Sequence, residues 1–268
     1  MASQKFDGMI KQITLIGICL FLNGTNPLRA QSNLIKRPVT VMSFNIHAGY
    51  GTDGTFNLLK IGNQIREAQP DIVCLQEVDR RTRRSQGKDV TLELANITGF
   101  HSFFGKAIPY DGGDYGLAIL SKYPILEARV HSLPSDGIAE SRIALEVMVQ
   151  IKGINKIRVV NVHLDHSNKE LNQSQIRYLD SKFRDEFPTI LAGDFNQTMN
   201  DKGMQHLSKV WNLSMTDDAF TYPSNNPNIK IDYLMAYPRN KWKVENAQVL
   251  KDSRASDHLP IIATFSLL

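Results

Sequence analysis

The pentapeptide Ser256-Asp257-His258-Leu259-Pro260 precedes a closing apolar strand and is the most informative feature of this chain. An Asp-His pair in such a position says little by itself. Five further polar clusters, however, also lie at the ends of apolar runs. They are Ser43-Phe44-Asn45, Gln76-Glu77, Asn161-Val162-His163, Gly193-Asp194-Phe195-Asn196 and Ile231-Asp232-Tyr233. Six strand-end clusters in one chain predict that distant segments converge on a single site.

The composition is that of a globular protein with a substantial core. The chain has 268 residues, of which 42% are hydrophobic and 22% are charged. These values fit one large α/β domain, or at most two small ones. No segment is of low complexity, and the sequence contains no internal repeat.

The first thirty residues have the order of a secretory signal peptide. Lys5 and Lys11 precede an apolar run over 13–22, and small and turn-forming residues follow. We therefore predict a signal peptide over 1–30, cleaved near Ala30, and a secreted or periplasmic protein. A bilayer span needs ~20 apolar residues. The run is shorter, so we expect no transmembrane segment in the mature chain.

The net charge depends on whether this segment is counted. Removing it lowers the formal charge from +4 to +2, so the basic character belongs mostly to the precursor. A mature charge this small does not indicate a dedicated nucleic-acid binder.

The two cysteines are expected to lie in different parts of the precursor, one in the signal peptide and one in the mature domain. Cys19 lies in the predicted signal peptide, where lipid attachment is an alternative that the bulky Ile18 disfavours. After cleavage only Cys74 is left, so no internal disulfide can form and stability must come from the core. Cys74 sits in the apolar run 72–75 and is expected to be a buried small hydrophobe.

Hydrophobic periodicity predicts four helices and many short strands, several of them in adjacent pairs. The helices are expected over 56–68, about 90–98, from 167 to 183, and over 200–208. For the third, Ser167 and Glu170 have the spacing of a capping box. The strands are expected at 39–44, 72–75, about 101–105, 115–121, 125–132, 142–151, 156–162, 189–192, 230–236, 243–250 and 260–267. Two mixed sheets packed together, with helices outside, would bury these strands on both faces.

In their order along the chain, the six clusters resemble the motifs of the endonuclease/exonuclease/phosphatase superfamily. One motif such as Gly-Asp-Phe-Asn is modestly specific, whereas six in the family order are highly specific, and the similarity covers residues 39–267. The chain looks closest to the metal-dependent hydrolase branch, and is similar to pancreatic-type deoxyribonucleases and neutral sphingomyelinases. The resemblance implies a four-layered α/β/β/α sandwich over 38–268, after a short N-terminal extension, 31–37. It also implies metal-dependent cleavage of a phosphate ester.

Three residues are predicted metal ligands. Glu77 ends a buried run, where a bare carboxylate is costly. A hard cation such as Mg²⁺ (or Mn²⁺) would remove that cost, because Mg²⁺ typically binds one or two carboxylates plus water and phosphate. Asn45 is its expected uncharged neighbour. Asp257 either faces the metal or braces its loop. The alternatives are a salt bridge for Glu77 and a turn or cap role for Asn45.

The catalytic residues are predicted from chemistry and from the resemblance together. His258 is the expected general base, and Asp232 would fix its tautomer and stabilise its charged form. Asp194 would align the attacking water or accept its proton, and Asn196 would donate a hydrogen bond to a phosphoryl oxygen. An Asx-type turn is the alternative for these last two residues. The resemblance places His163 against the phosphate or the leaving oxygen.

Other polar residues are left with two interpretations. Arg142 is either a substrate contact, since guanidinium matches a phosphate fork, or part of a surface ion pair. His166 belongs to the rim or only to the helix start, and Tyr222 to a pocket wall or to loop packing. The basic run after Glu77 is either an anion-attracting rim or a solvated loop. The remaining histidines, expected to be structural or exposed, are His47, His101, His131 and His206.

Together these features predict an exported, Mg²⁺- or Mn²⁺-dependent phosphoesterase, favouring a phosphodiester and acting as a monomer. A secreted DNA or RNA nuclease is one alternative, and a lipid head-group phosphodiesterase is another. A catalytically silent binding protein on the same scaffold is the alternative of a different class.

Overall fold

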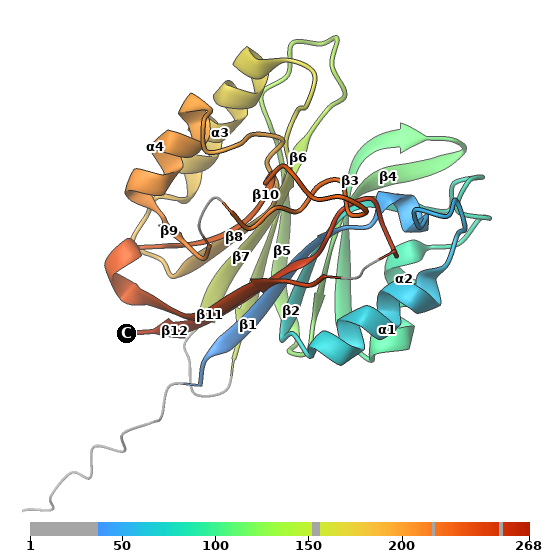
Figure 1. Ribbon diagram of the computed structural model, residues 1–268, viewed down its shortest axis with the longest axis horizontal. Coiled ribbons are helices and arrows are strands. Elements are labelled where there is room, and N and C mark those ends of the chain that lie inside the picture. The colour runs from blue at the N-terminus through green and yellow to red at the C-terminus, as the bar shows by residue number, and fades with distance from the viewer. Residues whose placement is uncertain (1–36, 152–155, 216–217, 252–253) are drawn as a thin grey trace, which may run out of the picture. The chain divides into compact units, whose positions relative to one another are not determined.

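The computed structural model describes residues 37–151, 156–215, 218–251 and 254–268. The predicted signal peptide and all but the last residue of the N-terminal extension lie outside these ranges. The described residues form two six-stranded sheets and four α-helices (Figure 1). The predicted fold class, two mixed sheets flanked by helices, is therefore confirmed.

The first sheet combines the two ends of the domain. Its strands are β1 (Val39–Asn45), β2 (Ile72–Arg80), β3 (His101–Tyr110), β4 (Gly113–Ser121), β11 (Trp242–Val249) and β12 (Ile261–Leu267). Their order across the sheet is β11-β12-β1-β2-β4-β3. Strands β1 and β2 are parallel, so both end at the same edge of the sheet, with Asn45 opposite Gln76.

The second sheet is built from the middle of the chain. Its strands are β5 (Ile125–Ser132), β6 (Ile143–Gln150), β7 (Lys156–His163), β8 (Thr189–Asp194), β9 (Asn212–Leu213) and β10 (Asp232–Tyr237), in the order β5-β6-β7-β8-β10-β9. Strands β7 and β8 are parallel and place His163 opposite Asp194. Antiparallel β10 begins with Asp232, also opposite Asp194.

Three apolar layers hold these elements together. Between the sheets, β-branched and other aliphatic side chains such as Val41, Ile119, Val159 and Ile190 are fully buried. Burial on both faces explains why these strands read as near-continuous apolar runs. The outer layers lie under two helix pairs (Figure 1). The helices are α1 (Leu58–Ala68) and α2 (Val90–Thr98) on the first sheet, and α3 (Lys169–Phe183) and α4 (Lys202–Val210) on the second.

The predicted capping box of α3 is wrong. The N-cap is Asn168, whose Oδ1 accepts from Leu171 N at 3.1 Å. Ser167 instead donates from N and Oγ to Asp165 Oδ1, at 2.9 and 3.0 Å. A carboxylate two residues upstream is a strong local acceptor, and such contacts compete with a capping role. The helix therefore begins one residue later than the spacing suggested.

A buried polar bridge joins the two sheets near their site-bearing ends. Gln76 Nε2 of β2 donates to Asn161 Oδ1 of β7 at 2.6 Å, and both side chains are fully buried. Asn161 Nδ2 in turn donates to the carbonyl oxygens of Leu75 and Ala118, at 2.8 and 3.0 Å. Buried hydrogen bonds of this kind favour one packing arrangement, although Gln76 Oε1 has no hydrogen-bond partner among the described residues. The bridge therefore sets the relative position of the strand ends that carry the candidate site.

Among the described residues, no helix has the length and apolar character required to cross a bilayer.

Candidate active site

Glu77 lies at a β-bulge in β2. The pairing with β4 shifts register between Leu75 and Val78, and Glu77 adopts φ 55°. A positive φ is uncommon for a residue other than glycine and costs of order 1–3 kcal/mol, which tends to be retained at functional sites. The bulge breaks the alternation of the strand and directs the Glu77 carboxylate towards the end of β1.

Asn45 connects carboxylates from the two sheets. Its side chain is fully buried at the end of β1, and Nδ2 donates to Glu77 Oε1 at 3.0 Å and to Asp194 Oδ2 at 3.1 Å. Its Oδ1 accepts from His47 N at 3.1 Å. The amide is therefore oriented with its donors between the two carboxylates. Its role as a metal ligand stays a prediction.

Asp194 is held by the backbone around it. The preceding Gly193 has φ 150°, and a Cβ there would lie 2.0 Å from Val162 O, so only glycine fits. Asn196 N donates to Asp194 Oδ1 at 2.9 Å, and Asn196 Nδ2 donates to Leu164 O at 3.0 Å. The Asx turn considered for this motif is thus present, and it leaves Asp194 Oδ2 directed at the site.

His258 and Asp232 form the predicted pair. His258 Nδ1 lies 3.0 Å from Asp232 Oδ2, and both side chains are buried. The other ring nitrogen, Nε2, lies 3.7 Å from Asp194 Oδ2. The Tyr222 ring packs on the imidazole with centroids 4.8 Å apart, which makes this tyrosine part of the wall.

Burial and mutual charge shift the pKa values of this cluster. Burial, followed by the charge of Asp232, raises the pKa of Asp194 to about 7. Burial alone would lower the pKa of His258. The negative charges of Asp232 and Asp194 have the larger combined effect and raise this pKa to about 10. Strongly shifted groups gathered in one place are typical of functional sites.

His163 meets the same carboxylate from the other side. Its Nε2 lies 3.6 Å from Asp194 Oδ2, and its Nδ1 lies 3.1 Å from Arg142 Nη1. Arg142 also contacts His166 Nδ1 at 3.4 Å and Glu140 Oε1 at 3.0 Å. Arg142 is only 5% exposed, so in its ion pair with the exposed Glu140 the guanidinium itself is buried. Burial, then the charge of Arg142, lowers the pKa of His163 well below its usual value.

Asp257 lies at the edge of the cluster. Its Oδ1 lies 3.2 Å from Ser256 Oγ and 3.9 Å from His47 Nδ1. Ser256 Oγ donates its hydrogen to Asn45 O at 2.7 Å, which ties this loop to β1. Loop bracing is therefore visible for Asp257, and contact with a metal stays a prediction.

Sequence reasoning missed part of the site. Tyr115 is buried in β4, and burial, then the nearby Glu77 carboxylate, raises the pKa of its phenol. Its sequence neighbours, Asp114 and Gly116, did not signal this position. Gln76 and Asn161 did stand in the strand-end clusters, but they support the site through the inter-sheet bridge and do not line it.

Three of the remaining histidines lie elsewhere, as expected. His131 Nε2 lies 2.6 Å from Glu146 Oε2, and His206 Nε2 lies 2.8 Å from Asp180 Oδ2. His101 is exposed in β3. The fourth, the half-exposed His47, lies beside Asp257 at the edge of the cluster.

Three of the four arginines in the basic run after Glu77 are paired with neighbouring acids, and Arg81 is exposed. Arg83 Nε lies 2.8 Å from Asp111, Arg84 Nε lies 2.7 Å from Asp79, and Arg80 is paired in the same way. These contacts favour the solvated-loop interpretation over a free cationic rim.

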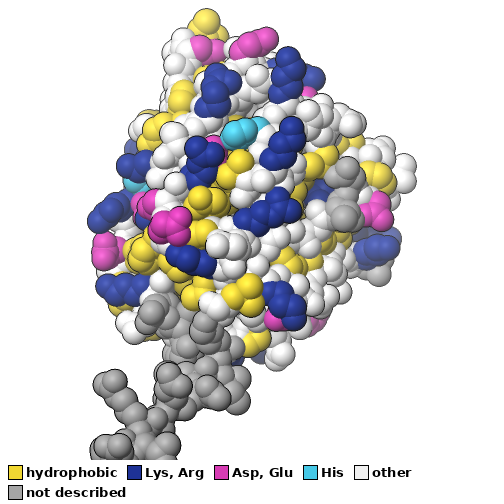
Figure 2. All heavy atoms as spheres, turned by 90° about the vertical axis from the view of Figure 1, so that its left-hand side faces the viewer, with side chains coloured by type: hydrophobic (Ala, Val, Ile, Leu, Met, Phe, Trp, Pro, Cys, Tyr) yellow, Lys and Arg dark blue, Asp and Glu magenta, His cyan; other side chains and the backbone are white. Residues whose placement is uncertain are grey.

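The face that carries α3 and α4 is not uniformly charged. Figure 2 shows Lys and Arg side chains spread over it, with acidic and apolar side chains between them. Lys241, for example, pairs with Glu186 at 2.9 Å, and Lys243 with Glu245 at 2.7 Å. Such mixing does not resemble the continuous basic stripe of a nucleic-acid binder.

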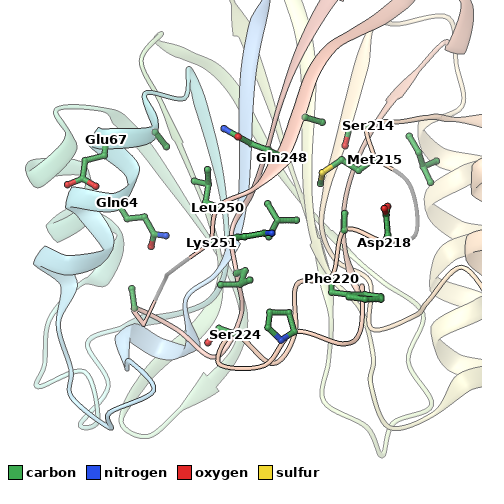
Figure 3. A pocket seen from close by; sticks show the side chains of 18 of the residues that line it. Gln64, Glu67, Ser214, Met215, Asp218, Phe220, Ser224, Gln248, Leu250 and Lys251 are labelled. Carbon is green, nitrogen blue, oxygen red and sulfur yellow. The ribbon is translucent and has the colours of Figure 1, made fainter.

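A broad groove lies next to the loop that carries Asp257 and His258, and Ala255 and Leu259 of that loop line it. It is bordered by α1, β11 and the segment around Met215 and Phe220, and Figure 3 shows side chains such as Leu250 and Lys251 along it. None of the predicted catalytic, substrate-binding or metal-binding residues lines it. The chemistry is therefore assigned to the strand-end cluster and not to this groove.

The strand-end cluster fits a hard cation. One ligand atom each from Asp194, Asp232 and His258 lies within 4.8 Å of the others. Asp232 Oδ1 is buried and has no hydrogen-bond partner among the described residues. Glu77 adds a further carboxylate through Asn45. Oxygen-rich sets of this kind suit Mg²⁺ or Mn²⁺.

Two mixed sheets packed face to face, with acidic and histidine side chains gathered at their strand ends, define a class of phosphoester hydrolases. The chain belongs to the Endonuclease/Exonuclease/phosphatase family, whose model matches residues 42–258. Members of this family hydrolyse phosphate esters and generally use divalent metals.

Individual proteins show the same relationship. The uncharacterised protein YbhP of Escherichia coli is 27% identical in an alignment of length 248 that covers 85% of this chain and 96% of YbhP. An endonuclease/exonuclease/phosphatase from Beutenbergia cavernae has a similar structure, with a TM-score of 0.73 and 24% identity, over 87% of this chain and 72% of that one. A mannosyl-6-phosphatase from Bacteroides thetaiotaomicron also has a similar structure, with a TM-score of 0.71 and 20% identity, over 85% of this chain and 100% of that one. At these identities the two structures establish the fold alone.

Proposed function

We propose that this protein is an exported, Mg²⁺- or Mn²⁺-dependent phosphoesterase that cleaves phosphodiesters with water activated by His258 and Asp232. The observation that carries the proposal is the convergence of Asp194, Asp232 and His258, whose ligand atoms lie within 4.8 Å of one another. These residues come from separate strand ends, and their burial and the raised pKa values of Asp194 and His258 fit acid–base chemistry.

The His258 imidazole has the position of a general base. The pKa of about 10 keeps both ring nitrogens protonated in the metal-free protein, and the charge of a bound cation beside the ring would favour its neutral form. In that neutral form Asp232 accepts the hydrogen on Nδ1, and the Nε2 lone pair is directed at the interior of the cluster. From there Nε2 takes the proton of the attacking water, and Asp232 stabilises the charge that develops on the ring. Asp194, within 3.7 Å of Nε2, aligns that water. This arrangement supplies both the direction of attack and the proton acceptor.

Donors on the opposite side would bind the phosphoryl group. His163 Nε2 lies 3.6 Å from Asp194 Oδ2, and the half-buried Asn196 has one amide hydrogen left after its bond to Leu164 O. Fixed donors of this kind stabilise charge that grows on phosphoryl oxygens in the transition state.

Glu77 is the proposed principal cation ligand, with Asn45 and Asp257 beside it. The unusual φ of Glu77 and the two hydrogen bonds of Asn45 hold this group at the strand ends. When bound, the cation would neutralise phosphoryl oxygens and stabilise the leaving oxygen.

A substrate panel tests the proposal. Hydrolysis of bis(p-nitrophenyl) phosphate is expected in Mg²⁺ or Mn²⁺ and lost in chelator, with slower turnover of p-nitrophenyl phosphate. Faster cleavage of the monoester would indicate a phosphatase instead. The Bacteroides neighbour is named as a phosphatase. Absence of cleavage across diesters, monoesters, nucleic acids and sphingomyelin would leave a silent binding protein.

Export rests on the order of basic, apolar and small residues over 1–30. We expect the mature chain outside the cytoplasm, with an N-terminus near residue 31, and a monomer in solution. Cell fractionation, N-terminal sequencing and light scattering check these three points separately. An N-terminus that retains residues 1–30 would contradict export.

A further inference from the structure

Arg142 is buried between two imidazoles, at the start of β6. Its Nη1 lies 3.1 Å from His163 Nδ1, and its Nη2 lies 3.4 Å from His166 Nδ1. Glu140 Oε1, 3.0 Å from Nη1, balances the guanidinium charge. The same nitrogen of each ring therefore faces the same cation.

Hydrogen-bond chemistry allows only one arrangement at these contacts. A guanidinium has five N–H donors and no acceptor, and it keeps its proton in proteins. Whichever imidazole nitrogen faces it must therefore offer a lone pair. For His163 this leaves the single ring hydrogen on Nε2, the nitrogen that lies 3.6 Å from Asp194 Oδ2. The tautomer follows from the partner on the far side of the ring.

We propose that Arg142 is a positioning residue that locks His163 as the neutral Nε2–H tautomer, so that His163 acts as a fixed hydrogen-bond donor to the substrate phosphate and not as an acid or base. The inference rests on the proposed function for its catalytic meaning, although the tautomer itself is a property of the free protein. It assigns different tasks to the two histidines of the site.

The surroundings of the two rings differ as this assignment requires. His258 Nδ1 faces a carboxylate, Asp232, which accepts the ring hydrogen and leaves Nε2 as the basic atom. His163 Nδ1 faces a donor, so its Nε2 carries the hydrogen. The two Nε2 atoms lie 3.7 and 3.6 Å from the same Asp194 oxygen. In the neutral rings the Nε2 of His258 offers a lone pair at this point, and the Nε2 of His163 offers a hydrogen. A phosphate between them would meet a base and a donor on opposite sides.

Histidine-selective NMR of the full chain tests the lock without substrate. Long-range ¹H–¹⁵N spectra at neutral pH are expected to show the His163 ring, assigned from the signal lost in His163→Gln, with hydrogen on Nε2 alone. Arg142→Met is expected to lose this single-tautomer pattern, whereas Arg142→Lys, which keeps one donor, should retain it. The exposed His166 provides the matched control, because His166→Ala removes a partner of Arg142 and should leave the His163 pattern unchanged.

Two results would overturn the inference: hydrogen on Nδ1 of His163 in the wild-type protein, or an unchanged pattern in Arg142→Met. If Arg142→Met does not fold, the wild-type and Arg142→Lys spectra still decide. These readouts need no turnover, so they stand even if the proposed hydrolysis fails.

Kinetics test the catalytic meaning separately. The Gln amide can place a donor where His Nε2–H stood, so His163→Gln is expected to stay within about tenfold of wild-type activity. His163→Ala should lose ~100-fold or more, the usual cost of removing one oxyanion-type donor. Equal losses in both variants would show that His163 does more than donate a hydrogen bond.

Discussion

His258 Nδ1 lies 3.0 Å from Asp232 Oδ2, while His258 Nε2 lies 3.7 Å from Asp194 Oδ2. One imidazole thus links two carboxylates that stand opposite each other on neighbouring antiparallel strands, β10 and β8. Two buried carboxylates so close together require a positive partner. Here a protonated histidine or a cation can supply it, and the protonated histidine underlies the prediction of pH-dependent stability below.

Loss of either central residue should abolish most hydrolysis. We expect His258→Ala and Asp194→Ala each to lower kcat/KM for a chromogenic phosphodiester at least ~100-fold, the usual scale for a lost acid–base group. His101→Ala, which alters an exposed histidine of β3, serves as the control and should turn over normally. Unchanged turnover in both site variants would remove the basis of the role assignment.

The metal-free protein should lose stability as pH rises. The folded-state pKa of His258, about 10, exceeds its ordinary value of 6.5. The stabilisation is therefore complete below pH 6.5 and is lost as pH rises to 10. Asp194, whose pKa is raised from 3.8 to about 7, acts in the same direction because the folded state prefers its protonated form. A pKa change of one corresponds to roughly 1.4 kcal/mol.

Urea unfolding in chelator from pH 6 to pH 10 measures this effect. The free energy of unfolding is expected to fall by several kcal/mol in the wild-type protein and much less in Asp232→Asn, which removes the main charge that favours protonated His258. Other groups titrate in this range in both proteins, so the difference between the two curves is the informative quantity. Parallel curves would contradict the assignment.

The strand ends explain why so much of the site could be predicted from sequence. Parallel neighbours end at the same edge, so Asn45 with Gln76, and His163 with Asp194, follow from the positions of polar clusters after apolar runs. The apolar runs themselves, buried on both faces, indicate the sheets. Local pattern and fold agree here, which is why the architecture was predictable.

Other features depend on contacts that the local sequence does not encode. Glu77 faces the site because β2 is bulged by its pairing with β4, and no turn residue marks that bulge. For Arg142 the local sequence left a substrate contact and a surface ion pair open, whereas in the structure Glu140 and two histidines from a different segment enclose it. Tyr222 reaches the His258 ring from a loop 36 positions away. In each case tertiary packing overrides the local pattern.

Glu77 should determine cation affinity. Glu77→Gln keeps the side-chain volume and a hydrogen-bond acceptor for Asn45 but removes the charge. Mn²⁺ affinity, measured by calorimetry, is therefore expected to fall at least ~10-fold. A loss of that size is already typical when a residue that only supports a metal ligand is changed. Glu67→Gln, an exposed change on α1, is the matched control and should bind as the wild type does. Equal Mn²⁺ affinities in the two variants would show that Glu77 is not a principal ligand of the cation.

Gly193 should be irreplaceable on steric grounds. In Gly193→Ala the new Cβ would lie 2.0 Å from Val162 O on the parallel neighbour β7, and the residue would also keep φ 150°. The main chain of β8 would have to move, which would displace Asp194, so we expect a loss of ~3 kcal/mol or more in the free energy of unfolding.

Gly137→Ala provides the control. Gly137 also has a positive φ, 78°, but its Cβ would meet nothing within 4 Å. It should therefore lose only ~1 kcal/mol, from backbone strain alone. Urea denaturation of both variants gives the comparison. Similar losses would mean that the close approach of β7 and β8 does not account for this glycine.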